Sequence, residues 1–132
     1  MIKNYSKIIH LFLLFIVFSV PFLVRGLNLT GGFCNSSGGW GIVSDKKMLI
    51  FWSAVSLILL FCFLRNSQKK ILKLGIWFVF LGGASNLFER IYWGCVFDYL
   101  KIFSWYPAFN LGDVLVVLGT ILVLAVLLAP SF

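Results

Sequence analysis

The chain has 132 residues, of which 61% are hydrophobic and 11% are charged, and its net charge is +7. Soluble domains contain about 25% charged residues, so this composition excludes a disordered chain, a coiled coil, a nucleic-acid-binding module and a typical soluble enzyme. The mean hydropathy of +1.05 indicates an integral membrane protein. Because a helical span takes about 20 apolar residues, we expect a few spans and no separate soluble domain.

Apolar runs at residues 8–24, 48–64, 71–88 and 111–129 predict four transmembrane helices. Each run is close to the length that crosses about 30 Å of hydrocarbon at about 1.5 Å per residue. No run alternates strictly between polar and apolar residues, so a β-barrel is not predicted. We expect an all-α integral membrane protein in which residues 1–132 form a single four-helix domain. A small extracytoplasmic loop or β element is expected between the first two helices.

The first apolar run is interpreted as a retained span. Residues 19–25 after its most apolar part contain no small-x-small cleavage pattern, so a removed signal peptide is the less favoured interpretation. Pro21 lies within this run and is expected to kink or end the helix, because proline cannot donate the backbone hydrogen bond that a helix needs.

Basic residues predict the orientation in the membrane. The link between the second and third runs contains Arg65, Lys69, Lys70 and Lys73 without any acid, and Lys3 and Lys7 precede the first run. Since cytoplasmic segments are enriched in Lys and Arg, both termini and this link are expected in the cytoplasm. The longer connections, at about residues 25–47 and 89–110, then face the other side. All the acids lie in or beside that outer layer: Asp45, Glu89, Asp98 and Asp113.

The cysteines and the histidine give little indication of bound metal. Cys34 and Cys95 both fall in outer connections, so a disulfide between them is topologically possible, and the sequence leaves this pairing open. Cys62 lies within the second run and is expected to be an apolar packing residue. His10 is the only histidine and has no neighbouring Cys or acid, so no metal site and no cofactor are predicted.

Polar residues gather at the outer ends of the third and fourth runs. Asn86 and Arg90 are four residues apart and share a helix face, and Asn110 and Asp113 are three apart at the start of the fourth run. Asp113 has two interpretations. It is either an acid of the first helical turn, where the helix dipole favours a negative charge, or one of a pair with Asp98. Two close carboxylates cannot both ionise easily, so such a pair could act as general base and general acid in peptide hydrolysis.

The segments between Gly82 and Asp113 resemble the lipoprotein signal peptidase (signal peptidase II) family, most specifically in Pro107-Ala108-Phe109-Asn110-x-x-Asp113. The chain is identified as a divergent, short member. The resemblance implies an aspartyl endopeptidase that removes the signal peptide of lipid-modified prolipoproteins on the amino side of the diacylglyceryl-Cys. It implies a monomer in the bacterial cytoplasmic (inner) membrane, with its active site at the extracytoplasmic face. The implied partners are the prolipoprotein and membrane lipids, with no cofactor and no nucleic acid.

The resemblance also implies roles for individual residues. Asp98 and Asp113 would be the catalytic dyad, and Asn110 would help to hold it. The residues implied to support the site or to contact the substrate are Asn35, Asn86 and Arg90.

The chain departs from the family pattern in several places. The Asp-Gln pair that the family usually has near the outer end of the first span has no counterpart in residues 18–22. Glu89 stands where an Asp is usual, and Gly112 stands where an Ala is usual. The alternative function is a non-catalytic small membrane protein, such as an inactive relative, an assembly factor or a transporter subunit. Asp98 and Asp113 would then be solvated or capping acids.

Overall fold

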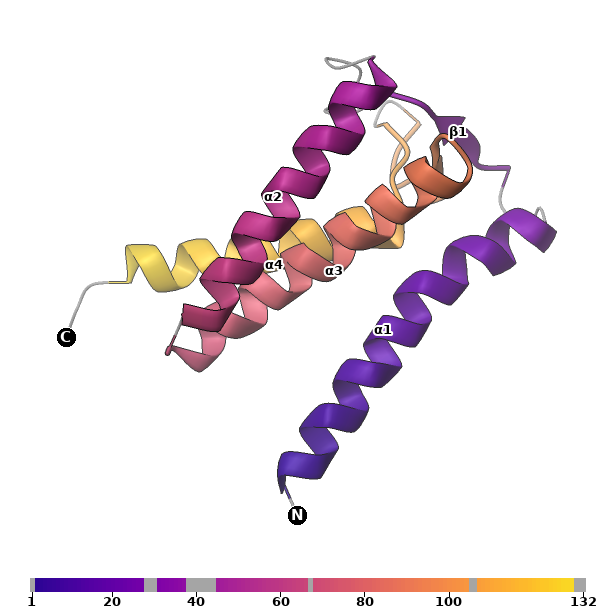
Figure 1. The fold of residues 1–132 in the computed structure, drawn as a ribbon. Helices are drawn as coiled ribbons and strands as arrows, with labels where there is room; N and C mark the ends of the chain where they lie inside the picture. Colours follow the sequence, from indigo (N-terminus) through magenta and orange to yellow (C-terminus); the bar gives the residue numbers. More distant parts are fainter. Residues whose placement is uncertain (1, 28–30, 38–44, 67, 105–106, 130–132) are drawn as a thin grey trace.

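The structure, a computed structural model, describes residues 2–27, 31–37, 45–66, 68–104 and 107–129. In these residues it contains four helices and two short strands (Figure 1). The helices are α1 (Ile2–Leu27), α2 (Lys46–Asn66), α3 (Lys70–Tyr92) and α4 (Leu111–Leu128), and the strands are β1 (Phe33–Asn35) and β2 (Val96–Asp98). The side chains of residues 2–7 lie outside the description, so the expectation based on Lys3 and Lys7 is not addressed.

The predicted spans are confirmed within the described residues. Each of the four helices contains a segment of 18 to 23 residues with a mean hydropathy between 1.6 and 2.7, long and apolar enough to cross a membrane. Two of the helices continue past the ends of the predicted apolar runs. Helix α1 continues through Pro21 to Leu27, and α3 continues through Glu89 and Arg90 to Tyr92. The apolar run ends before the helix does because the last turns of α3 carry the polar residues of a site.

Helix α2 lies at the edge of the bundle, where it packs on α3 and has no buried residue of its own (Figure 1). The expectation that Cys62 packs in an apolar interior is therefore wrong, because its side chain is exposed on α2. In a membrane-spanning helix an outward-facing apolar surface meets lipid, so exposure does not conflict with the apolar character of α2.

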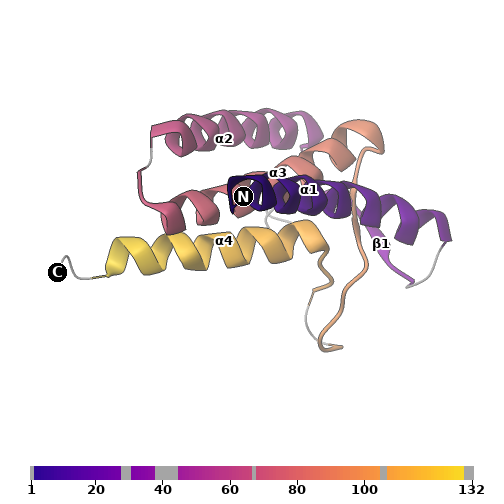
Figure 2. The same ribbon diagram turned by 90° about the horizontal axis from the view of Figure 1, so that it is seen from below.

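Helices α3 and α4 form the closest pair in the bundle, and they cross at glycines. Gly75 of α3 lies against Gly119 of α4, and Gly82 of α3 lies against Gly112 of α4. A Cβ added to Gly119 would lie 2.5 Å from the Gly75 carbonyl oxygen. Small residues let helix backbones approach closely in a membrane, where apolar burial does not drive helices together. This crossing brings Gly82 and Asn86 of α3 beside the first turn of α4. Figure 2 shows α3 between α2 and α4.

Helix α1 meets the rest of the bundle through a narrow stripe of residues. Val17 is buried against Leu81 of α3 and Leu115 of α4. The backbone carbonyl of Val17 also accepts a hydrogen bond from the Ser85 hydroxyl at 3.3 Å. The outer end of α1 lies beside the strands, so the chain enters β1 at the end of the molecule where α3 ends (Figure 1).

The predicted β element is present, but its partner lies in the other outer connection. β1 pairs antiparallel with β2 in the register Phe33↔Asp98, Cys34↔Phe97 and Asn35↔Val96. The open question about the cysteines is answered here: Cys34 and Cys95 form a disulfide, with Cα atoms 5.5 Å apart. The two outer connections are therefore joined, and β2 ends at Asp98 directly beside residues from β1.

We expect the glycine crossing to limit stability. Gly119→Ala should lower the stability of the folded protein by about 1–3 kcal/mol, because the added methyl group overpacks a backbone contact. Thermal unfolding in detergent micelles measures this as a lower midpoint. Gly26→Ala is the matched control, since no heavy atom lies within 4 Å of a Cβ added there. Equal midpoints for the two variants would contradict the interpretation of the crossing.

Candidate active site

Asp98 ends β2 and is almost fully buried, with 3% of its surface exposed. Its two carboxyl oxygens accept hydrogen bonds from side-chain amides, Oδ2 from Asn35 Nδ2 at 2.9 Å and Oδ1 from Asn110 Nδ2 at 3.0 Å. Burial raises the pKa of Asp98 above its usual value, and the two amide donors act in the opposite direction. The protonated form of Asp98 is therefore easier to reach than that of an exposed aspartate.

Asp113 lies in the first turn of α4 and forms a capping box with Asn110. The Asp113 N–H donates to Asn110 Oδ1 at 3.0 Å, and the Asn110 N–H donates to Asp113 Oδ2 at 3.2 Å. The capping interpretation of Asp113 is confirmed. Its other oxygen, Oδ1, accepts a hydrogen bond from Asn86 Nδ2 at 2.8 Å, so the same carboxylate also faces α3.

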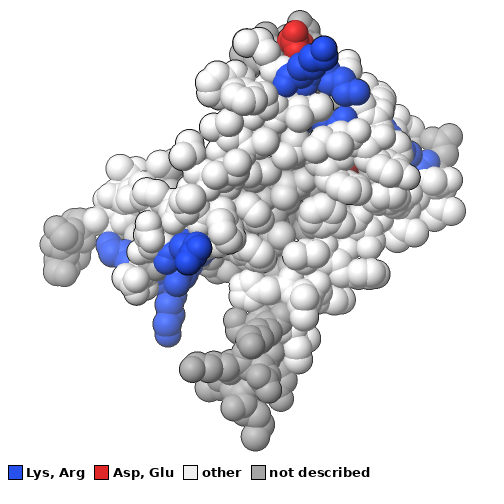
Figure 3. All heavy atoms as spheres, viewed as in Figure 1, with Lys and Arg blue, Asp and Glu red and all other residues white. Residues whose placement is uncertain are grey.

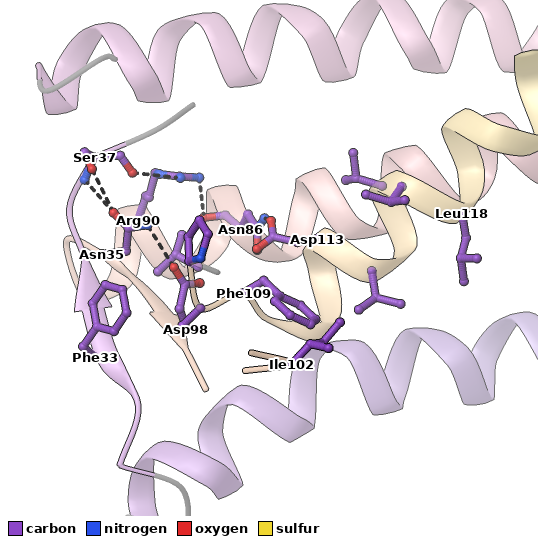
Figure 4. A pocket seen from close by; sticks show the side chains of 16 residues that line it. Phe33, Asn35, Ser37, Asn86, Arg90, Asp98, Ile102, Phe109, Asp113 and Leu118 are labelled. Carbon is purple, nitrogen blue, oxygen red and sulfur yellow. Dashed lines mark hydrogen bonds between the residues drawn. The ribbon is translucent and has the colours of Figure 1, made fainter. Parts of the chain in front are cut away.

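Asn110 connects the two acids. Only 1% of its surface is exposed, and it donates to Asp98 through its side chain and to Asp113 through its backbone. Asp98 and Asp113 both line one cavity of about 750 Å³, and Figure 4 shows them beside it with Asn86 and Arg90. The negative charge of Asp113 contributes to raising the pKa of Asp98. Asp113 can therefore cap α4 and also pair with Asp98, because Asn110 is bonded to both acids.

Arg90 places a positive charge beside both acids. Its Nη1 lies 3.5 Å from the Asn86 carbonyl oxygen and its Nη2 lies 3.5 Å from the Ser37 carbonyl oxygen, so it joins α3 to the first outer connection (Figure 4). The charges of Asp98 and Asp113 both act on the guanidinium. The structure brings every predicted site residue into one hydrogen-bond network: Asn35, Asp98, Asn110, Asp113, Asn86 and Arg90.

Ser37 is a residue of this network that the sequence analysis missed. Its backbone N–H and its hydroxyl both donate to Asn35 Oδ1, at 3.1 Å and 2.9 Å. These bonds orient the Asn35 amide so that its nitrogen faces Asp98. The sequence contains an indication of this geometry, because an Asn that bonds to the backbone two residues later is a common turn.

Glu89 is a second residue whose place the sequence analysis did not foresee. It is buried, with 2% of its surface exposed, and its Oε2 accepts a hydrogen bond from the Phe97 N–H at 2.9 Å. This bond fastens β2 to the last turns of α3, directly before Asp98. The sequence showed Glu89 only as an acid in the outer layer and as a departure from the family pattern.

The cavity beside the acids is mainly apolar. Its walls include Ile102 and Phe109 from the second outer connection and Val114, Val117 and Leu118 from α4. A smaller cavity of about 390 Å³, bounded by α2, α3 and α4, also reaches Asn86, Arg90 and Asp113. In the part of the chain that the structure describes, no group of three His, Cys, Asp or Glu side chains could hold a metal ion.

The bond from Asn110 to Asp98 gives a prediction about ionisation. In Asn110→Ala the Asp98 carboxylate loses an amide donor, so its pKa should rise further. Loss of the cap should also lower stability by about 1–2 kcal/mol. Carbon-13 NMR of labelled aspartate carboxyl groups, followed against pH, measures the first effect. Asn66→Ala, an exposed site at the end of α2, is the control. An unchanged or lower pKa in Asn110→Ala would contradict the assigned contact.

Known proteins similar to this chain include curated lipoprotein signal peptidases. A lipoprotein signal peptidase of Clostridium tetani is 33% identical to this chain over 97 residues, which cover 68% of this chain and 62% of that protein. A lipoprotein signal peptidase of Staphylococcus aureus (strain JH9) is 31% identical over 103 residues, which cover 74% of this chain and 63% of that protein. The chain therefore spans a little under two thirds of the length of these relatives.

Solved structures of bacterial membrane enzymes share the fold. One, obtained by the in meso method at 2.3 Å resolution, has a TM-score of 0.82 at 22% identity and covers 95% of this chain and 88% of its own. Another, at 1.9 Å resolution, has a TM-score of 0.79 at 23% identity, and the match covers 97% of this chain and 95% of that chain. The family described as signal peptidase (SPase) II matches residues 5–129. Because that match takes in nearly the whole four-helix domain, the chain belongs to the signal peptidase II family.

Proposed function

We propose that this protein is an intramembrane aspartyl endopeptidase that removes the signal peptide from lipid-modified prolipoproteins, on the amino side of the diacylglyceryl-Cys. One observation carries the proposal: Asp98 and Asp113 line the same cavity and are joined through Asn110. The name of the curated relatives, lipoprotein signal peptidase, supports the substrate class.

In the proposed reaction the two acids have different starting states. Asp98, whose protonated form is favoured by burial, starts as the acid in this proposal, and Asp113 starts as the carboxylate. The Asp113 carboxylate takes a proton from a water molecule, whose oxygen attacks the peptide carbonyl carbon. Asp98 gives its proton to the carbonyl oxygen. As the tetrahedral intermediate collapses, Asp113 returns a proton to the leaving amine and Asp98 recovers its own, so no cofactor is consumed.

The neighbouring polar residues have supporting roles in this proposal. Asn110 and Asn86 hold the two carboxylates in place through direct bonds. Arg90 limits the repulsion between the acids, because its positive charge acts on both. Asn35 holds Asp98 from the first outer connection and lies on the cavity wall, where a peptide would pass. The apolar residues of α4 suit a signal peptide that enters from the bilayer.

The proposal includes an orientation in the membrane. Figure 3 shows Lys and Arg side chains near the ends of the molecule, separated by a broad surface without charge. The link between α2 and α3 carries Arg65, Lys69, Lys70 and Lys73, and by the positive-inside rule these residues support a cytoplasmic location for the link in a bacterial cell. Both termini then lie in the cytoplasm, the acids lie at the extracytoplasmic face of the inner membrane, and the protein acts as a monomer surrounded by lipid.

One observation favours the alternative, a non-catalytic membrane protein. The capping box gives Asp113 a structural role that requires no chemistry. An inactive relative, an assembly factor or a transporter subunit would retain this cap and the fold. The two functions differ in whether the acids are needed for turnover.

The acids can be tested directly. Asp98→Asn and Asp113→Asn should each reduce cleavage of a diacylglyceryl-modified prolipoprotein by at least about a hundredfold, because the general acid or the general base is lost. Gel mobility and mass spectrometry of the product report the cleavage. Asp45→Asn is the matched control, since Asp45 accepts a hydrogen bond from the Met48 N–H at the start of α2 and does not line the cavity. Normal cleavage by either site variant would favour the non-catalytic function.

A further inference from the structure

The two-stranded sheet that carries Asp98 is too short to be stable alone. It consists of three residue pairs, and an isolated pair of strands is at best marginally stable in water. A disulfide and a hydrogen bond to a buried side chain reinforce this sheet. The Cys34–Cys95 disulfide joins the two strands' segments across a sequence separation of 61 residues. The Phe97 N–H bonds to the buried Glu89 carboxylate.

The disulfide is anchored on its outer side by α1. Arg25, in the last turn of α1, points its Nη2 at Cys95 Sγ at 3.1 Å and at Cys34 Sγ at 3.5 Å. The same guanidinium lies over the rings of Trp93 and Phe97, 4.5 Å and 5.2 Å from their centres. Such a cation–π contact stabilises the position of a partly desolvated guanidinium. The disulfide is thus fixed against α1 and the end of α3.

The disulfide lies next in sequence to the residues that form the Asn35–Asp98 hydrogen bond. Cys34 directly precedes Asn35, whose amide donates to Asp98 Oδ2 at 2.9 Å. Cys95 directly precedes β2, which ends at Asp98. The covalent bond therefore fixes the separation of the two segments that bring donor and acceptor together. Without it, Asn35 is held to Asp98 only by the three-pair ladder and by hydrogen bonds.

We propose that Cys34 and Cys95 are positioning residues for the site: their disulfide keeps Asn35 bonded to Asp98, and full cleavage activity requires the oxidised pair. This inference rests on the proposed function. Two thiols form the disulfide by losing two electrons and two protons. A disulfide-type oxidant, of the thiol–disulfide exchange class, accepts them and becomes a dithiol. The extracytoplasmic side, where the proposed orientation places both cysteines, is the compartment in which such bonds persist.

The proposal has a consequence for the ionisation of Asp98. The groups that face Asp98 are the amides of Asn35 and Asn110 and the charges of Asp113, Arg90 and Glu89. Opening the disulfide removes only the first of these. Because the Asn35 bond lowers the pKa of Asp98, reduction should raise that pKa and leave the other contributions in place. A disulfide that served stability alone would not move it.

The experiment uses the full chain with Cys62→Ser, so that thiol labelling reports only on Cys34 and Cys95. Cys62 is exposed on α2, away from the site, and this variant should retain the parent activity. Alkylation with a mass-tagged maleimide should label neither cysteine before reduction and both after it. Reduction should lower kcat/KM on a diacylglyceryl-modified prolipoprotein at least about tenfold, and reoxidation with oxidised glutathione should restore it. The reversibility separates loss of positioning from failure to fold.

A double-mutant cycle gives the second measurement. Asn35→Ala should lower kcat/KM and raise the pKa of Asp98 in the oxidised protein, but it should have little further effect in Cys34→Ser/Cys95→Ser, because the contact is already weakened there. Additive effects, free thiols before reduction, or full activity after reduction would each overturn the inference. If Asp98→Asn and Asp113→Asn retain activity, the proposed function fails instead. The pKa of Asp98 from carbon-13 NMR then still decides whether the disulfide positions Asn35.

Discussion

The arrangement of the site depends on one buried side chain, Asn110. A helix begins with backbone N–H groups that have no partner inside the helix, and Asn110 satisfies one of them with its side-chain oxygen. The nitrogen of the same amide then donates to Asp98, and its backbone N–H donates to Asp113. Asn110 thus caps α4, as the start of a helix requires, and its remaining hydrogen-bonding atoms hold Asp98 and Asp113. The position of the acids therefore follows from how α4 begins.

The packing of α3 on α4 makes this possible. Gly82 lies against Gly112, so the backbones approach closely enough for Asn86 to reach Asp113. A Cβ on Gly112 would lie 2.6 Å from Asn86 Oδ1 and 2.9 Å from Asn110 Oδ1. Gly112 stands where the family pattern has Ala, and in this chain a methyl group there would require the Asn86 or Asn110 side chain to shift. This departure from the family pattern is thus tied to the site by the two asparagines beside it.

The sequence predicted the parts of the structure that depend on local patterns. The spans followed from apolar runs, and the pairing of Asn110 with Asp113 followed from their helical spacing. Ends of elements were less predictable, because Glu89 and Arg90 are polar residues that continue α3 for a tertiary reason. The pairing of β1 with β2 and the disulfide were beyond local reasoning, since each joins segments about 60 residues apart. Asp98 and Asn35 were identified by resemblance to the family. The hydrogen bond between them could be recognised only from the folded structure.

The capping box also bears on how the protein responds to heat. Helix ends open at a lower free-energy cost than helix centres, so they fluctuate before the whole domain unfolds. In α4 the terminal turn contains Asp113 and is fastened by Asn110. If that single turn opens, the two acids separate even though the spans remain helical. The site is therefore more sensitive to local opening than the helices around it, because it depends on one capped turn of α4.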